Sequence, residues 1–179
     1  MGYYVRKITL SKWPKPHGNP SIIHEYDIRS LRADAIADIR TFNDNLSIWS
    51  IASDSDEDID EAVLALATSI KQEKFDKMDV VVISDDDILA RGLKLKSIEG
   101  DTAVVDLKDT HRNIVGLTYD SLTSVMRIIS EITIAGRHIR RNQRSIEKLI
   151  TNNLDRIDMD AFSNDSIKDE IRSITRTAM

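Results

Sequence analysis

The chain of 179 residues contains no cysteine. Disulfide bonds and thiolate metal sites are therefore excluded, and such a chain suits a reducing compartment. No apolar run approaches the ~20 residues that a membrane-spanning helix needs. The opening residues, MGYYVRKITL, carry tyrosines and charges where a secretory signal peptide has an apolar core. These absences predict a cytoplasmic protein with no membrane partner.

Signatures of enzymes and cofactor sites are also missing. The six glycines stand alone, so there is neither a glycine-rich phosphate loop nor a Gly-x-Ser-x-Gly turn. The four histidines, His17, His24, His111 and His138, lack the close pairs typical of zinc ligands. We therefore predict no cofactor, no metal and no catalytic residue.

Charge is present in quantity but unevenly divided. Residues 1–110 contain 14 Lys and Arg against 21 Asp and Glu, whereas residues 111–179 contain 11 against 9. The first part should repel nucleic acid and acidic lipid, and the second can approach them only through a local basic patch. The whole chain lacks the strongly basic balance typical of nucleic-acid-binding proteins.

Strand and helix patterns alternate over the first 110 residues. Strand 46–51, the following helix and the apolar strand 80–83 predict a crossover, right-handed if the two strands are parallel. All three prolines fall between residues 14 and 20, which predicts an extended loop. The predicted elements of this part are strands at 3–10, 21–28, 46–51, 80–83, 93–98 and 103–107, and helices at 33–40, 54 to 72–75, and 85–91.

After residue 116 the pattern is helical, with predicted helices at 117–136, 139–153 and 165–176. A three-four rhythm defines one apolar face through this stretch. Its width favours packing inside the chain, and pairing with a second copy is the alternative. Gly136 interrupts the face, and the chain either continues or turns there. The face consists of Leu122, Val125, Ile129, Ile132, Gly136, Ile139, Gln143, Ile146 and Ile150.

These patterns predict an α+β fold. It comprises a small mixed β-sheet with one packed amphipathic helix, followed by a helical portion of about three helices. Residues 1–110 form the sheet-containing part and residues 111–179 the helical part, and the two can form one continuous domain.

Arginines recur at helical spacing opposite the apolar face, and they are the predicted binding residues. Guanidinium groups bind carboxylate and phosphate groups bidentately and lose their hydration more readily than lysine does. The alternative is a solvated outer face that only keeps the helix soluble. The predicted binding residues are Arg137, Arg140, Arg141 and Arg144, with Lys148 and Arg127 as extensions.

Two acidic runs admit a structural and a functional interpretation. Residues 54–61 do not fit a calcium loop, because the sixth position from Asp54 is Ile59, so we interpret them as a helix start. Residues Asp85–Asp87 follow an apolar strand. Either Ser84 or Asp85 caps a short helix there, or the carboxylates hold Mg²⁺ for phosphoryl transfer.

Together these observations predict a non-enzymatic interaction protein of a bacterial type, such as an accessory, regulatory or immunity-like factor. Its expected partner is another protein. The alternatives are nucleic acid bound through Arg137–Arg144, a Mg²⁺-dependent phosphoryl-transfer enzyme or nuclease using Asp85–Asp87, and a homo-oligomer formed through the Leu122–Ile150 face.

Overall fold

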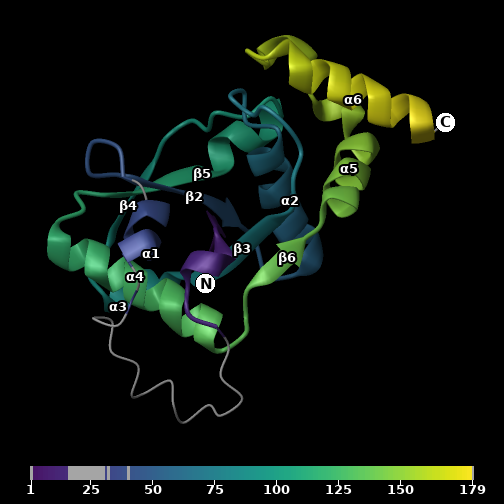
Figure 1. Cartoon of the computed structure of the whole chain (residues 1–179). Coiled ribbons are helices and arrows are strands. Elements are labelled where there is room, and N and C mark those ends of the chain that lie inside the picture. Colours follow the sequence, from purple (N-terminus) through teal and green to yellow (C-terminus); the bar gives the residue numbers. More distant parts are fainter. Residues whose placement is uncertain (1, 16–30, 32, 40, 179) are drawn as a thin grey trace.

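The computed structural model of the protein describes residues 2–15, 31, 33–39 and 41–178. Within this part, a six-stranded sheet lies between two layers of helices (Figure 1). The predicted strand at 21–28 lies outside the described residues. The strands are β1 (Tyr3–Ile8), β2 (Leu46–Ile51), β3 (Met78–Ser84), β4 (Lys94–Ser97), β5 (His111–Val115) and β6 (Ile139–Arg141). The α-helices are α1 (Ala33–Asp38), α2 (Asp56–Ala67), α3 (Asp85–Ala90), α4 (Tyr119–Ile134), α5 (Gln143–Asn152) and α6 (Asp165–Ala178).

The strand order is β4-β5-β2-β1-β3-β6, and each of these pairings is antiparallel. The predicted α+β fold with a helical C-terminal part is confirmed. The prediction of a mixed sheet is not, because every strand pairing is antiparallel. β2 and β3 run parallel to each other, as the predicted crossover requires, yet β1 lies between them and is antiparallel to both. The sheet also takes strands from both sides of residue 110, because β5 pairs with β2 and β4.

Each face of the sheet covers its own apolar core. On one face, Val5 of β1 and Val80 of β3 pack against residues of α2, α5 and α6. On the other face, Ile8 and Val81 pack against residues of α1, α3 and α4. Alternation of side chains along each strand separates the two cores.

The apolar face from Leu122 to Ile150 is divided between these two cores. Ile129 of α4 belongs to the α1–α3–α4 side, whereas Ile146 and Ile150 of α5 belong to the α2–α5–α6 side. All three are completely buried within the chain. This part of the face therefore packs internally, as favoured above.

A turn at Gly136 produces this division. Gly136 has φ +69°, Gly136 N–H donates to the Thr133 carbonyl, and Arg137 N–H donates to the Ile132 carbonyl. These two bonds form a Schellman motif that ends α4. The chain then pairs with β3 as β6 before α5 begins. The prediction of a helix over 139–153 is therefore wrong for its first four residues. Residues 139–141 form the edge strand β6, and Asn142 is the N-cap of α5.

Helix α2 begins as predicted and ends earlier. The Ser55 side chain accepts a hydrogen bond from Asp58 N–H, and three carboxylates occupy the first turn. The helix ends at Ala67 instead of near 72–75, since the Thr68 hydroxyl bonds to the Leu64 carbonyl and to Thr102. The predicted strand at 103–107 is also wrong, because most of it lies in a short 3-10 helix, η4 (Val105–Thr110).

Candidate functional site

The arginines of the predicted helix face lie on three different elements. Arg137 follows α4, Arg140 and Arg141 are successive residues of β6, and Arg144 is in the first turn of α5. Successive strand residues point to opposite faces of a sheet, so the side chains of Arg140 and Arg141 diverge. The prediction that the four arginines share one helix face is therefore wrong. Their role in binding stays a prediction.

Arg140 is bound to Asp79, its cross-strand neighbour on β3. Arg140 Nε lies 2.7 Å from Asp79 Oδ1, and Nη2 lies 3.1 Å from Oδ2. The hydrogen bonds to Asp79, and then its charge, raise the pKa of Arg140. Only 9% of the Asp79 side chain is exposed. Since a buried carboxylate without a partner is costly, Arg140 has a structural task at this sheet edge.

Arg141 connects β6 to α2 on the opposite face of the sheet. Its Nε lies 2.7 Å from Asp60 Oδ1, and its Nη2 lies 2.6 Å from Asp56 Oδ1. Burial lowers the pKa of Arg141, but the hydrogen bonds and charges of Asp56 and Asp60 outweigh it, and the net shift is upward. The two aspartates are one helical turn apart, so one guanidinium group binds both, and the cluster keeps a net charge of −1.

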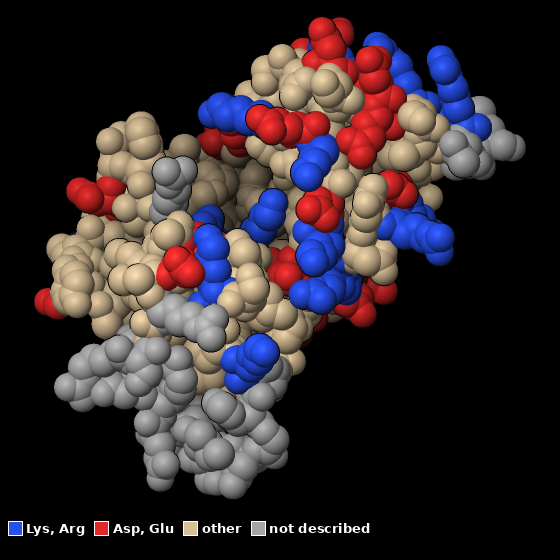
Figure 2. All heavy atoms as spheres, viewed as in Figure 1, with Lys and Arg blue, Asp and Glu red and all other residues tan. Residues whose placement is uncertain are grey.

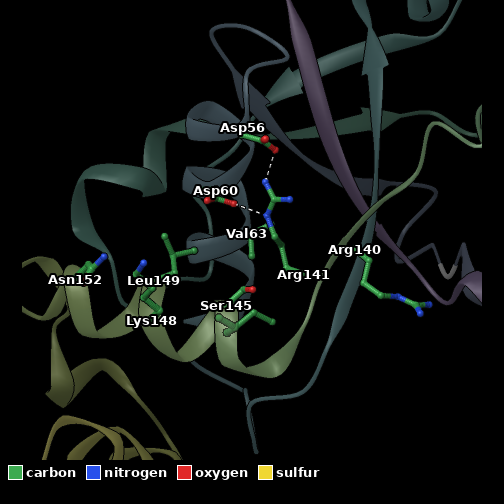
Figure 3. Close-up of a pocket in the computed structure, with 10 residues that line it drawn as sticks. Asp56, Asp60, Val63, Arg140, Arg141, Ser145, Lys148, Leu149 and Asn152 are labelled. Atoms are coloured by element: carbon green, nitrogen blue, oxygen red, sulfur yellow. Dashed lines mark hydrogen bonds and ion pairs between the residues drawn. The ribbon is translucent and has the colours of Figure 1, made fainter. Parts of the chain in front are cut away.

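A pocket of about 470 Å³ opens beside this ion pair, between α2, β6 and α5. Figure 3 shows the Arg141 side chain pointing to Asp60 and Asp56, whereas the Arg140 side chain points away from them. We call this cavity the α2–α5 pocket. Its lining residues are Asp56, Asp60, Val63, Arg140, Arg141, Ser145, Ile146, Lys148, Leu149 and Asn152.

A second cavity, of about 530 Å³, lies along α5 on the side of α6. It shares Lys148 and Asn152 with the α2–α5 pocket, so these two side chains stand between the cavities. We call it the α5–α6 groove. Its lining residues are Arg144, Glu147, Lys148, Thr151, Asn152, Ser173 and Ile174.

The two cations of α5 have no side-chain partner within the described ranges. Arg144 and Lys148 are exposed, and neither forms an ion pair or side-chain hydrogen bond with any residue that the structure describes. They are one helical turn apart, so they lie on the same side of α5. Arg137 is also exposed and has no side-chain partner among the described residues. Arg137 and Arg144 are therefore available to a ligand, while Arg140 and Arg141 are held by carboxylates.

Carboxylates line the same two cavities as Arg144 and Lys148. Asp56 and Asp60 line the α2–α5 pocket, and Glu147 lines the α5–α6 groove. Figure 2 shows basic and acidic side chains alternating over the part of the surface that α5 and α6 form. The site therefore offers charges of both signs beside apolar positions such as Val63, Leu149 and Ile174.

The sequence does not reveal the role of Asp56 and Asp60. They precede Arg141 by 85 and 81 positions, and their position at a helix start already explains their charge. Only the sheet pairing of β6 brings Arg141 beside α2. Lys148 is different, since its spacing from Arg144 in the sequence already places both on one side of a helix.

Ser84 caps α3, as one interpretation predicted, and Asp85–Asp87 form the first turn of this helix. The Ser84 hydroxyl accepts from Asp87 N–H, and the Asp87 carboxylate accepts in return from Ser84 N–H. Asp85 accepts from the Tyr4 hydroxyl at 2.6 Å and from Gly2 N–H at 2.8 Å. Among the described residues, no group of three or more His, Asp or Glu side chains is placed to hold a metal ion.

The chain matches no protein-family model, no curated protein and no solved structure. None of the helices in the described ranges is long and apolar enough to cross a membrane.

Proposed function

We propose that this protein binds another protein through the surface of α5, and that it serves as an accessory, regulatory or immunity-like factor. One observation carries the proposal: Arg144 and Lys148 have no side-chain partner in the part of the chain that the structure describes, and they line two adjoining cavities. Free cations beside shaped cavities can receive carboxylate side chains of a partner. Complementary charges of this kind fix the orientation of a complex and speed its formation.

The mixed charge of the site favours a protein over nucleic acid as the partner. Nucleic-acid binding depends on neutralising many phosphates, and each contact needs a free cation. Here Arg140 and Arg141 are already neutralised, and Asp56, Asp60 and Glu147 would repel a phosphate backbone. A protein partner can form ion pairs with charges of both signs, because its surface carries basic and acidic side chains.

A pull-down from an extract of the native host tests this proposal. The bait carries Lys148→Glu together with Arg144→Glu, and quantitative mass spectrometry compares it with the wild-type bait. We expect a protein that the wild type enriches to fall at least tenfold with the variant, because two attractive contacts become repulsive. Lys94→Glu is the matched control, since Lys94 is exposed on β4 at the opposite edge of the sheet.

Two results would contradict the proposal. One is a partner that all three baits capture equally. The other is a mobility shift with duplex DNA or RNA that weakens steeply between two salt concentrations and disappears in the Lys148→Glu, Arg144→Glu variant. That second result would assign α5 to nucleic acid instead.

A further inference from the structure

A serine and a histidine form a close pair on the sheet, away from the α5 surface. Ser47 of β2 and His111 of β5 lie on adjacent strands, and the Ser47 Oγ is 2.6 Å from His111 Nε2. Both residues are half-buried. A hydroxyl within hydrogen-bonding distance of an imidazole nitrogen is the arrangement that activates serine nucleophiles.

The other contacts of His111 fix which ring nitrogen carries the proton. Nδ1 lies 3.1 Å from the carbonyl oxygen of Ile98. A carbonyl oxygen only accepts hydrogen bonds, so Nδ1 is the donor and the neutral ring presents the Nε2 lone pair to Ser47. Burial is the main cause of a lowered pKa at His111, with Arg112 acting in the same direction and Asp101 opposing it. The ring is thus neutral and ready to accept a proton at neutral pH.

Packing around His111 holds the ring in place. The ring meets Trp49 edge-on, with centroids 5.0 Å apart. Gly100 leaves room for this contact, because a Cβ there would lie 2.5 Å from the Trp49 ring and 2.9 Å from His111 Cβ. A base oriented by a third group and by packing is the second requirement of a nucleophile–base pair.

Two polar residues continue the row from Ser47 across the same face of the sheet. Asn113 is directly opposite Ser47 across the β2–β5 pairing, and Lys96 is opposite Asn113 across the β4–β5 pairing. Neither side chain has a partner in the part of the chain that the structure describes. Opposed residues of this kind have Cβ atoms about 5 Å apart, so the Asn113 amide lies next to the hydroxyl. The Lys96 cation stands one strand further, about 10 Å from Ser47 across the sheet.

We propose that Ser47 and His111 are the nucleophile and the general base of an acyl-transfer site for esters that carry an anionic group. Ser47 Oγ bonds to the ester carbonyl carbon while its proton passes to His111 Nε2. The bond from that carbon to the leaving alcohol breaks, and the alcohol takes the proton from Nε2. Water then attacks the acyl-serine through the same base, which releases the acid and restores Ser47. Asn113 donates to the developing oxyanion, and Lys96 pairs with the anionic group.

Labelling with a fluorophosphonate tests the nucleophile on the full chain. Ser47 Oγ bonds to phosphorus, fluoride leaves, and the proton passes to His111. We expect intact mass and peptide mapping to place the adduct on Ser47, and Ser47→Ala to abolish it. His111→Gln should slow labelling about 100-fold, the usual contribution of a general base. Ser50→Ala, on the opposite face of the same strand, should label like the wild type.

The pH profile of wild-type labelling gives a readout that does not depend on any variant's folding. The rate should rise with the deprotonation of one group whose pKa is below that of an ordinary histidine. No adduct on Ser47, or labelling that His111→Gln leaves unchanged, would overturn the proposal.

The preference for anionic esters is tested by comparing the hydrolysis rates of 4-nitrophenyl hemisuccinate and 4-nitrophenyl butyrate. Equal rates, or a preference that survives Lys96→Gln, would overturn that part.

Discussion

Two neighbouring arginines show how the same residue type takes different roles. Arg141 is only 18% exposed and binds Asp56 and Asp60, whereas Arg144, three positions later, is exposed and has no side-chain partner among the described residues. The sequence places both at helical spacing and cannot separate them. The difference arises from β6, whose pairing with β3 decides where each guanidinium group points.

Arg141→Ala should lower the free energy of unfolding by about 1–2 kcal/mol, because it removes charge-assisted hydrogen bonds that are partly exposed and leaves two carboxylates facing each other. Arg144→Ala is the matched control and should change it by less than about 0.5 kcal/mol. Urea denaturation measures both. Equal losses would mean that Arg141 does not anchor β6 to α2.

The Tyr4 hydroxyl should lose its proton at an unusually high pH. Burial, and then the hydrogen bond to Asp85 and its charge, raise the pKa of Tyr4 to about 12 from 10.0. Because the folded pKa is the higher one, the neutral phenol stabilises the fold below pH 10, and this contribution is lost as the pH rises towards 12. A spectrophotometric titration of phenolate should lose one late-titrating group in Tyr4→Phe. An unchanged upper part of the curve would contradict the Asp85 contact.

Among the elements, β6 departs most from the sequence pattern. Ile139 and Ile146 continue the apolar spacing of a helix, and periodicity alone predicts one through both. Strand pairing overrides this local pattern, because β3 otherwise has an open edge at Met78–Val80. Helices α3 and α2 were easier to predict, since capping serines and first-turn carboxylates are local signals.

Gly136 is the residue on which the path of β6 depends. Gly136→Ala should destabilise the protein by about 1–2 kcal/mol, because a side chain is strained at φ +69°. Gly136→Asn should recover part of this loss, since asparagine tolerates the left-handed conformation. Thermal unfolding of both variants is the measurement. An alanine variant as stable as the wild type would show that α4 does not need this turn.

Leu66 of α2 is less buried than the apolar spacing of this helix predicts. The helical spacing points to Leu66 as a core residue, yet Leu64 is fully buried while Leu66 is only partly so. Leu64→Ala should therefore cost about 2–5 kcal/mol of unfolding free energy. We expect Leu66→Ala to cost clearly less in the same urea titration. The reverse order would mean that α2 is rotated relative to the sheet.

At the scale of the whole molecule, sequence patterns account for the α+β class and not for the sheet order. Strand order depends on contacts between segments that are distant in the sequence, such as the pairing of β1 with both β2 and β3. The local spacing of apolar residues does not indicate which distant strands pair. The same limit applies to the α2–α5 pocket and to the Ser47–His111 pair, whose members are 64 positions apart.

Stability of the whole protein should fall in mild acid. The folded pKa of His111 lies below 6.5, mainly through burial, so the unfolded chain takes up a proton first as the pH drops. This stabilisation is complete above about pH 6.5 and is lost as the pH falls through the folded pKa. The slope of unfolding free energy against pH between about 7 and 5 should be smaller in His111→Gln. Identical slopes would contradict the buried, neutral ring.

Site-specific photo-crosslinking tests the α5 binding surface most directly. A benzophenone amino acid replaces Asn152, which is exposed and lines both cavities, in one version and Lys94 in the other, and each is irradiated in an extract of the native host. Position 152 should give a discrete crosslinked protein band that position 94 does not, and Arg144→Glu should weaken it. A crosslink at position 152 that nuclease removes, or the same band from both positions, would contradict binding of a protein partner at α5.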